Sequence, residues 1–151
     1  MARPALGFRV SSRLAATPGD VWARVASFEG VNAELAPWVR MTLPEGAELR
    51  AGPLGRSWVL LAGLLPIDYD DLVLESYAPG RGFRERSALG SASVWWHDRT
   101  LVDLPGGGCR VVDEIGFTPR VGAFGGLQAF VFEALFRWRH HRLRRHFGVT
   151  G

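Results

Sequence analysis

The chain has 151 residues, of which 47% are apolar and 22% are charged, and its formal net charge is +3. This composition is typical of a globular protein, and the length predicts a single domain over residues 1–151. The only cysteine, Cys109, excludes an intrachain disulfide, and the small net charge gives no reason to expect a nucleic-acid partner.

The amino-terminal sequence contains no apolar segment followed by a cleavage site, so we expect no signal peptide. The longest apolar run, residues 59–65, is far shorter than the roughly 20 residues that a membrane span needs. Together with the single cysteine, these features predict a cytoplasmic protein without a transmembrane segment.

The beginning of the chain predicts one strand and two short helices. Apolar and polar residues alternate over residues 8–14, which indicates a strand. Thr17 can cap a helix that begins at Pro18, and Gly30 is expected to end this helix. A second short helix is expected over residues 31–35, before Pro37.

From residue 39 onward, apolar residues recur with a period of two, which predicts a series of strands. The expected strands cover residues 39–43, 47–51, 56–62, 67–77, 83–87, 95–104 and 109–117. The last two form a hairpin that turns at the glycines of residues 106–108. A long amphipathic helix over residues 127–147 follows, and its first half is apolar nearly all round.

This order of elements predicts an α+β fold. We expect a curved antiparallel sheet of six or seven strands wrapped around the long C-terminal helix, with two short helices after the first strand. A helix gripped by a curved sheet usually leaves a cavity between them.

Several short motifs occur in the order and spacing of one superfamily. They are ATPGDVW at residues 16–22, PGRGF at 79–83, WWHDR at 95–99, GGGC at 106–109, DEIGFTPR at 113–120 and FRWR at 136–139. On these motifs the chain resembles the START-like (SRPBCC) superfamily, whose helix-grip fold is shared with the birch pollen allergen family and with polyketide cyclases and dehydrases. The resemblance implies a deep apolar cavity but no single reaction, because such folds host carriers, cyclases and hydrolases.

A polar cluster is predicted at the C-terminal hairpin. If Pro105 pairs with Cys109, the position numbers of residues that face each other sum to an even number. One face then carries four polar residues: Glu85, His97, Arg99 and Asp113. This face is either the cavity wall or the sheet surface, where charged pairs are more common. A one-residue slip at the glycines would put Arg99 and Asp113 on opposite faces.

The candidate wall residues are mainly aromatic and apolar, as in most ligand pockets. They are Trp38, Trp58, Phe83, Glu85, Trp95, His97, Arg99, Asp113, Ile115, Phe117, Phe124, Leu127, Phe130, Val131, Ala134 and Trp138. The candidates for proton transfer are His97, Arg99 and Tyr69. No motif marks a serine or cysteine nucleophile, so no catalytic residue is assigned.

No cofactor and no metal site are expected, because histidines and acidic residues lack metal-ligand spacing. Asp68, Asp70 and Asp71 are interpreted as an exposed strand start. The arginine- and histidine-rich end of the last helix, residues 137–146, is interpreted as a solvated helix end whose cations complement the helix dipole. Contact of this end with phosphates or anionic lipid is the alternative.

The leading hypothesis for function is the binding of a small apolar or aromatic ligand, lipid-like or polyketide-like, in the internal cavity. The alternative is an enzyme of the polyketide cyclase or aromatase kind, in which the same cavity folds a ketone chain. A third hypothesis is a subunit that binds protein partners through exposed aromatic residues, and a homodimer is compatible with all three.

Overall fold

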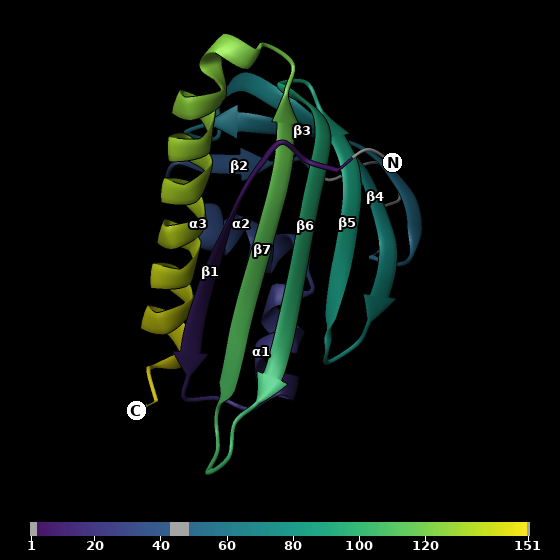
Figure 1. Cartoon of the computed structure of the whole chain (residues 1–151). Coiled ribbons are helices and arrows are strands. Elements are labelled where there is room, and N and C mark those ends of the chain that lie inside the picture. Colours follow the sequence, from purple (N-terminus) through teal and green to yellow (C-terminus); the bar gives the residue numbers. More distant parts are fainter. Residues whose placement is uncertain (1–2, 43–48, 151) are drawn as a thin grey trace.

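The computed structural model describes residues 3–42 and 49–150 (Figure 1). The strands are β1 (Leu6–Leu14), β2 (Val39–Met41), β3 (Gly52–Leu61), β4 (Leu65–Ala78), β5 (Gly82–Leu89), β6 (Ala92–Asp103) and β7 (Cys109–Pro119). The helices are α1 (Pro18–Val25), α2 (Phe28–Leu35), the short 3-10 helix η1 (Gly122–Phe124) and α3 (Gly125–Phe147).

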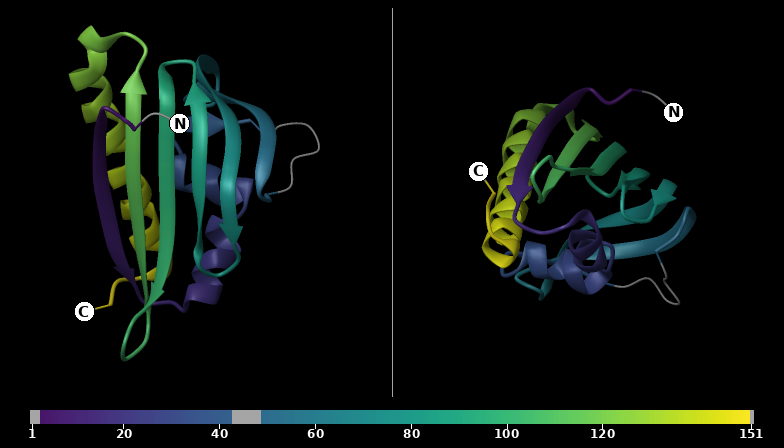
Figure 2. Two further views of the ribbon diagram at one scale, coloured as in Figure 1. Left: turned by 45° about the vertical axis from the view of Figure 1, so that its right-hand side comes forward. Right: turned by 90° about the horizontal axis from the view of Figure 1, so that it is seen from below.

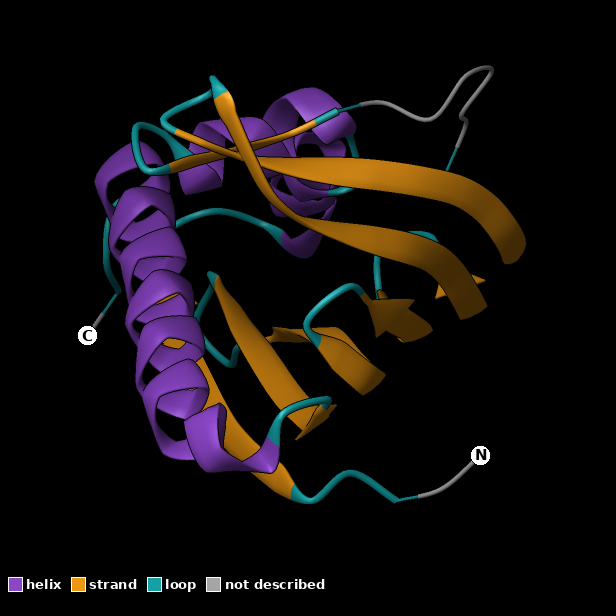
Figure 3. Cartoon of the chain, turned by 90° about the horizontal axis from the view of Figure 1, so that it is seen from above, coloured by secondary structure: helices purple, strands orange, loops and turns teal. Residues whose placement is uncertain are grey.

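All seven strands form one antiparallel sheet in the order β1-β7-β6-β5-β4-β3-β2. The sheet curls around the interior, with α3 along one side and with α1 and α2 on another (Figures 2 and 3). α3 packs against β1 and α2. The predicted α+β helix-grip fold is therefore confirmed.

Side-chain caps define where α1 and α2 begin. Thr17 Oγ1 accepts a hydrogen bond from the backbone N–H of Asp20 at 3.2 Å, and Ser27 Oγ accepts one from Gly30 at 3.0 Å. The cap at Ser27 places Gly30 inside α2, so the expectation that Gly30 ends the first helix is wrong. A Cβ at position 30 would lie 1.7 Å from the carbonyl oxygen of Arg24, so the close approach of α1 and α2 requires glycine.

The strands differ from the prediction mainly between β2 and β4. Residues 49–51 are not part of a strand, and the rest of the strand expected over residues 47–51 lies outside the described residues. β4 begins at Leu65 and not at Ile67, because Leu65 and Pro66 pair with the end of β3. This longer strand moves Asp68 and Asp70 away from a strand start and into the middle of the sheet.

In the C-terminal hairpin, the side chains lie on the predicted faces of the sheet, but the residues pair differently from the prediction. Cys109 pairs with Asp103 and not with Pro105, and Arg99 lies directly opposite Asp113. The turn is wider than expected, and it is closed by a hydrogen bond from Gly107 N to Leu104 O at 3.0 Å. Because the pairing moves by an even number of residues, each side chain stays on its predicted face of the sheet.

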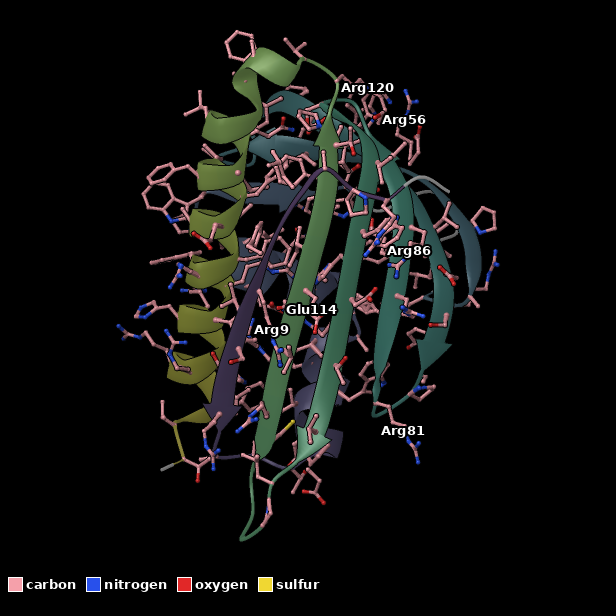
Figure 4. All side chains as sticks on the ribbon, viewed as in Figure 1. Arg9, Arg56, Arg81, Arg86, Glu114 and Arg120 are labelled. Carbon is pink, nitrogen blue, oxygen red and sulfur yellow. The ribbon has the colours of Figure 1, made fainter. Side chains whose placement is uncertain are left out.

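The two faces of the sheet carry charge in different ways. On the outer face, arginines and acidic residues pair across neighbouring strands and remain in contact with solvent (Figure 4). Arg9 and Glu114, for example, lie 4.0 Å apart, and both side chains are more than half exposed. The concave face carries three buried apolar clusters and, between them, a small number of fully buried charges.

Candidate functional site

A pocket of about 160 Å³ lies between the concave face of the sheet and the helices α1, α2 and α3. Its wall is mainly apolar and aromatic, as alternate residues of the strands meet one stripe of α3. Prominent wall residues are Leu72, Leu74, Tyr77, Phe83 and Trp95 from the sheet, and Phe132, Leu135 and Phe136 from α3. Such a wall is typical of small-molecule sites.

Polar side chains interrupt this apolar wall at one region. They are Asp68 and Asp70 on β4, Glu85 on β5, His97 on β6 and Arg139 on α3. Pairing of β5 with β6 places Glu85 directly opposite His97, and His97 Nδ1 lies 3.8 Å from Glu85 Oε1. The imidazole packs edge-on against Phe83 and Phe136, which fixes the orientation of its two nitrogens.

Asp113 is the centre of a buried hydrogen-bond network next to His97. Arg99 donates from Nε and Nη2 to the two carboxylate oxygens of Asp113, at 2.8 and 2.7 Å. His97 Nε2 lies 2.7 Å from Oδ1, and His140 Nε2 lies 2.7 Å from Oδ2. Because an ionised carboxylate only accepts hydrogen bonds, both histidines carry a proton on Nε2.

His140 is held in a single neutral tautomer. Arg144 Nη1 donates to one lone pair of Ser12 Oγ at 2.8 Å, and the serine hydroxyl donates to Nδ1 of neutral His140 at 2.7 Å. A histidine that accepts at Nδ1 and donates at Nε2 is uncharged. Burial lowers the pKa of His140, and this effect outweighs the opposing hydrogen bond to Asp113.

Arg99 connects this network to α2. Its Nη1 and Nη2 donate to Oε2 and Oε1 of Glu34 at 3.0 and 2.9 Å, and Arg139 Nε donates to the same Oε1 at 3.1 Å. The exposed fractions of Arg99, Asp113 and Glu34 are 1%, 0% and 2%. Two arginines thus face two carboxylates, and this balance with satisfied hydrogen bonds is what allows charges to be buried.

The electrostatics of the network keep both carboxyl groups ionised. Burial alone would raise the pKa of Asp113, but the charge and hydrogen bonds of Arg99 hold this pKa well below its usual range. The pKa of Glu34 is lowered in the same way, against burial, by Arg99 and Arg139. Their contribution to stability is therefore present above the unfolded pKa, about 4, and is lost as the pH falls through the lowered values.

Ser12, His140 and Asp113 contact one another in the order of a Ser-His-Asp triad. Their environment differs from that of a catalytic triad. Ser12 is 5% exposed, His140 and Asp113 are 0% exposed, and none of the three borders the pocket. The arrangement therefore joins β1, β7 and α3, and it offers no access for an acyl substrate.

We expect Ser12 to remain unmodified when the folded protein is treated with diisopropyl fluorophosphate, which reacts with activated serines. Mass spectrometry of the intact protein should show no adduct, because the hydroxyl is buried and engaged by His140 and Arg144. An adduct mapped to Ser12, and missing from a His140→Gln variant, would contradict the structural role of this triad.

Only some of the residues predicted to form the wall line the pocket. Phe83, Glu85, Trp95 and His97 line it. Four other predicted residues are buried in the sheet but do not border the pocket: Arg99, Asp113, Ile115 and Phe117. Of the three proton-transfer candidates, only His97 reaches the pocket.

The residues on and before α3 that were expected in the wall do not border the pocket. Phe124, Leu127, Phe130, Val131 and Ala134 are exposed, and Phe130 reaches 72%. A neighbouring stripe of the helix, which contains Phe132, Phe136 and Arg139, faces the pocket instead. The first half of α3 is apolar nearly all round, so its periodicity did not distinguish the two stripes.

The predicted wall residues Trp38, Trp58 and Trp138 and the proton-transfer candidate Tyr69 also lie away from the pocket. Trp138 donates from Nε1 to the carbonyl of Ala36 at 2.8 Å and contacts the exposed Trp38 edge-on. Trp58 and Tyr69 pair on the outer face of the sheet, where the guanidinium carbon of Arg56 lies 3.8 Å from the centre of the Tyr69 ring. Trp58 and Tyr69 face outward because each is adjacent along its strand to inward-facing residues.

Sequence reasoning missed Ser12, Glu34, Asp70, Arg139 and His140. The solvated-end interpretation is wrong for Arg139 and His140, which are 6% and 0% exposed. A signal existed, since both follow Phe136 at helical spacing on the buried stripe. Asp70 is 4% exposed and not part of an exposed strand start. Within residues 3–42 and 49–150, no three histidine, cysteine or acidic side chains are arranged to hold a metal ion.

The fold is similar to that of several solved structures. Protein CV1439 from Chromobacterium violaceum has a TM-score of 0.74 at 14% identity, with 95% of this chain and 99% of that chain covered. A START superfamily protein from Mycobacterium smegmatis has a TM-score of 0.66 at 10% identity, covering 92% and 97%. Ara h 8.0201 has a TM-score of 0.62 at 10% identity, covering 91% and 97%. At these identities the likeness shows the fold alone.

The chain therefore has the START-like helix-grip fold that its motifs predicted. Residues 12–147 match the family described as Domain of unknown function (DUF8410), and the chain belongs to this family. No functionally curated protein matches the chain. In the part of the chain that the structure describes, no helix is both long enough and apolar enough to cross a bilayer.

Proposed function

We propose that this protein binds a small apolar or aromatic ligand in the pocket between the sheet and α3. The observation that carries the proposal is the pocket itself, about 160 Å³ with a mainly apolar and aromatic wall. An engineered apolar cavity of about 150 Å³ binds benzene, so the volume fits a ligand with about one aromatic ring or a short chain.

The polar groups of the wall support a role in which the ligand is bound in one orientation. Pockets that bind small molecules typically combine an apolar wall with a few polar groups that converge at one region. Asp70, Glu85 and His97 occupy such a position on three consecutive strands. His97 is held by its hydrogen bond to Asp113, so the orientation of this side chain is set before any ligand arrives.

A filled pocket is expected to lose ligand affinity. Ala26 borders the pocket at the end of α1, so Ala26→Phe should place a ring in it. Isothermal titration calorimetry with ethylbenzene should show binding to the wild type and an affinity at least about tenfold lower in this variant, about 1.4 kcal/mol. Native mass spectrometry of freshly purified wild type would identify a ligand that copurifies.

The matched control is Ala134→Phe, which adds the same ring on the exposed face of α3. Its affinity for ethylbenzene should equal that of the wild type. Equal affinities in the wild type, in Ala26→Phe and in Ala134→Phe, with all three folded by circular dichroism, would mean that the probe binds elsewhere and would refute the assignment of the pocket.

An enzyme of the cyclase kind receives less support from the geometry. A proton donor or acceptor for a bound ketone would have to reach the pocket, and of the three candidates only His97 does. Its Nε2 is engaged by Asp113, so only Nδ1, which faces Glu85, is left for exchange. We therefore propose binding as the function and no reaction.

A further inference from the structure

One carboxyl group in the pocket wall is only partly hydrogen-bonded. Asp70 is 4% exposed, and its Oδ1 has no partner among the described residues. Asp68, on the same strand, accepts hydrogen bonds from the backbone N–H groups of Tyr69 and Ser91 at 2.9 and 3.0 Å. A buried oxygen without a donor is costly, so a ligand that brings a donor would be stabilised at this point.

The charge on this side of the pocket is also unbalanced. Arg99 and Arg139 form their ion pairs with Glu34 and Asp113, and within residues 3–42 and 49–150 no arginine forms an ion pair with Asp70. Arg56 and Arg86, on the strands that flank β4, pair with acidic residues on the outer face (Figure 4). Burial, followed by the negative charge of Glu85 and a hydrogen bond between the two carboxyl groups, raises the pKa of Asp70 well above its usual value.

We infer that the pocket binds a small apolar amine, whose protonated nitrogen supplies a cation for Asp70 and a hydrogen-bond donor for its unpartnered Oδ1. This inference rests on the proposed function, because it names the ligand class of the same pocket. An ammonium group carries only donors, and hydrogen bonds between ionised partners are the strongest available. The apolar wall around Leu72, Leu74 and Phe83 would hold the rest of the ligand.

Three probes of nearly equal size test the inference: 2-phenylethylamine, 2-phenylethanol and ethylbenzene. Titration calorimetry at pH 7.5 measures the affinity of the wild type for each. The amine is expected to bind at least about tenfold more tightly than ethylbenzene, because both probes bury the same ring and only the amine can form a charge-assisted hydrogen bond with Asp70. The alcohol should bind less tightly than the amine.

Two neighbouring aspartates provide a variant and its control. Asp70→Asn keeps the shape of the side chain and removes its charge, so the ratio of amine to ethylbenzene affinity should fall toward one. Asp71→Asn makes the same change on the outer face, where Asp71 pairs with Arg56 at 2.7 Å, and should keep the wild-type ratio.

The pH dependence gives a second measurement on the wild type. The other titratable or charged groups in the wall are Asp68, Tyr77, Glu85, His97 and Arg139. Because the amine needs Asp70 ionised, its affinity should increase as the pH rises from 5 to 8, while that of ethylbenzene should stay constant. The increase should therefore shrink in Asp70→Asn and remain in Asp71→Asn.

The outcomes separate the two proposals. Binding of ethylbenzene with no preference for the amine, or tighter binding of the alcohol than of the amine, would overturn the amine inference and leave the proposed function intact. A preference that persists unchanged in Asp70→Asn would also overturn it. If neither ethylbenzene nor the amine binds, the proposed function fails and the inference fails with it.

Discussion

Replacing Arg99 with methionine is expected to destabilise the protein by about 3–5 kcal/mol near pH 7, as for other broken buried ion pairs. The change leaves the fully buried Asp113 carboxylate without its cation, and it removes two of the donors that bind Glu34. Urea denaturation monitored by circular dichroism would measure the loss. Arg56→Met, which breaks a similar cross-strand pair on the outer face, should change the free energy of unfolding much less.

The stability loss in Arg99→Met should depend on pH, and its direction follows from the change in the pKa of Asp113. In wild type, Arg99 holds the pKa of Asp113 below its usual range. In Arg99→Met, burial acts without this cation and raises that pKa, so protonation relieves the buried charge and the penalty should shrink as the pH falls. Arg99→Met/Asp113→Asn should recover part of the stability at pH 7. A small, pH-independent loss without recovery would contradict the proposed importance of the buried pair.

Removing the carboxylate of Glu34 is expected to have an effect of similar size, about 3–5 kcal/mol for Glu34→Ala. Glu34 is the partner of Arg139 and the link through which α2 is bonded to Arg99. Glu34→Gln should be destabilised less, because the amide oxygen still accepts hydrogen bonds. Hydrogen exchange measured by mass spectrometry should be faster in α2 of both variants.

The control for this prediction is Glu29→Ala, an exposed position in the first turn of the same helix. It loses only a favourable interaction with the helix dipole, worth about 0.3–1 kcal/mol. If Glu34→Ala were no less stable than Glu29→Ala, the ion pairs of Glu34 would contribute nothing measurable to the fold.

Most of the fold was predictable because local signals agreed with the global arrangement. Period-two alternation predicted β5, β6 and β7, and the glycine-rich turn placed Glu85, His97 and Asp113 on one face. The boundary between α1 and α2 was not predictable from Gly30, since a glycine that ends a helix and one that permits a close helix contact look alike in sequence.

The site was predicted less well than the fold, and the reason lies in α3. The rotation of a helix that is apolar nearly all round depends on what it packs against, and neither the position of β1 nor that of α2 was available from sequence. Charged residues posed the same difficulty. Glutamate and arginine are usually exposed, but Glu34 and Arg139 are buried because they pair with each other. The two residues lie 105 positions apart in sequence.

The long sequence separations within the network also bear on the time course of folding. Contacts of Asp113 and Arg99 reach α2 and α3, and the bond between Ser12 and His140 joins positions 128 apart. We expect contacts of such long sequence separation to close late, after the strands have paired and the helices have docked. Interactions that form after the transition state slow unfolding without accelerating folding. The buried charges are therefore expected to slow unfolding more than they accelerate folding.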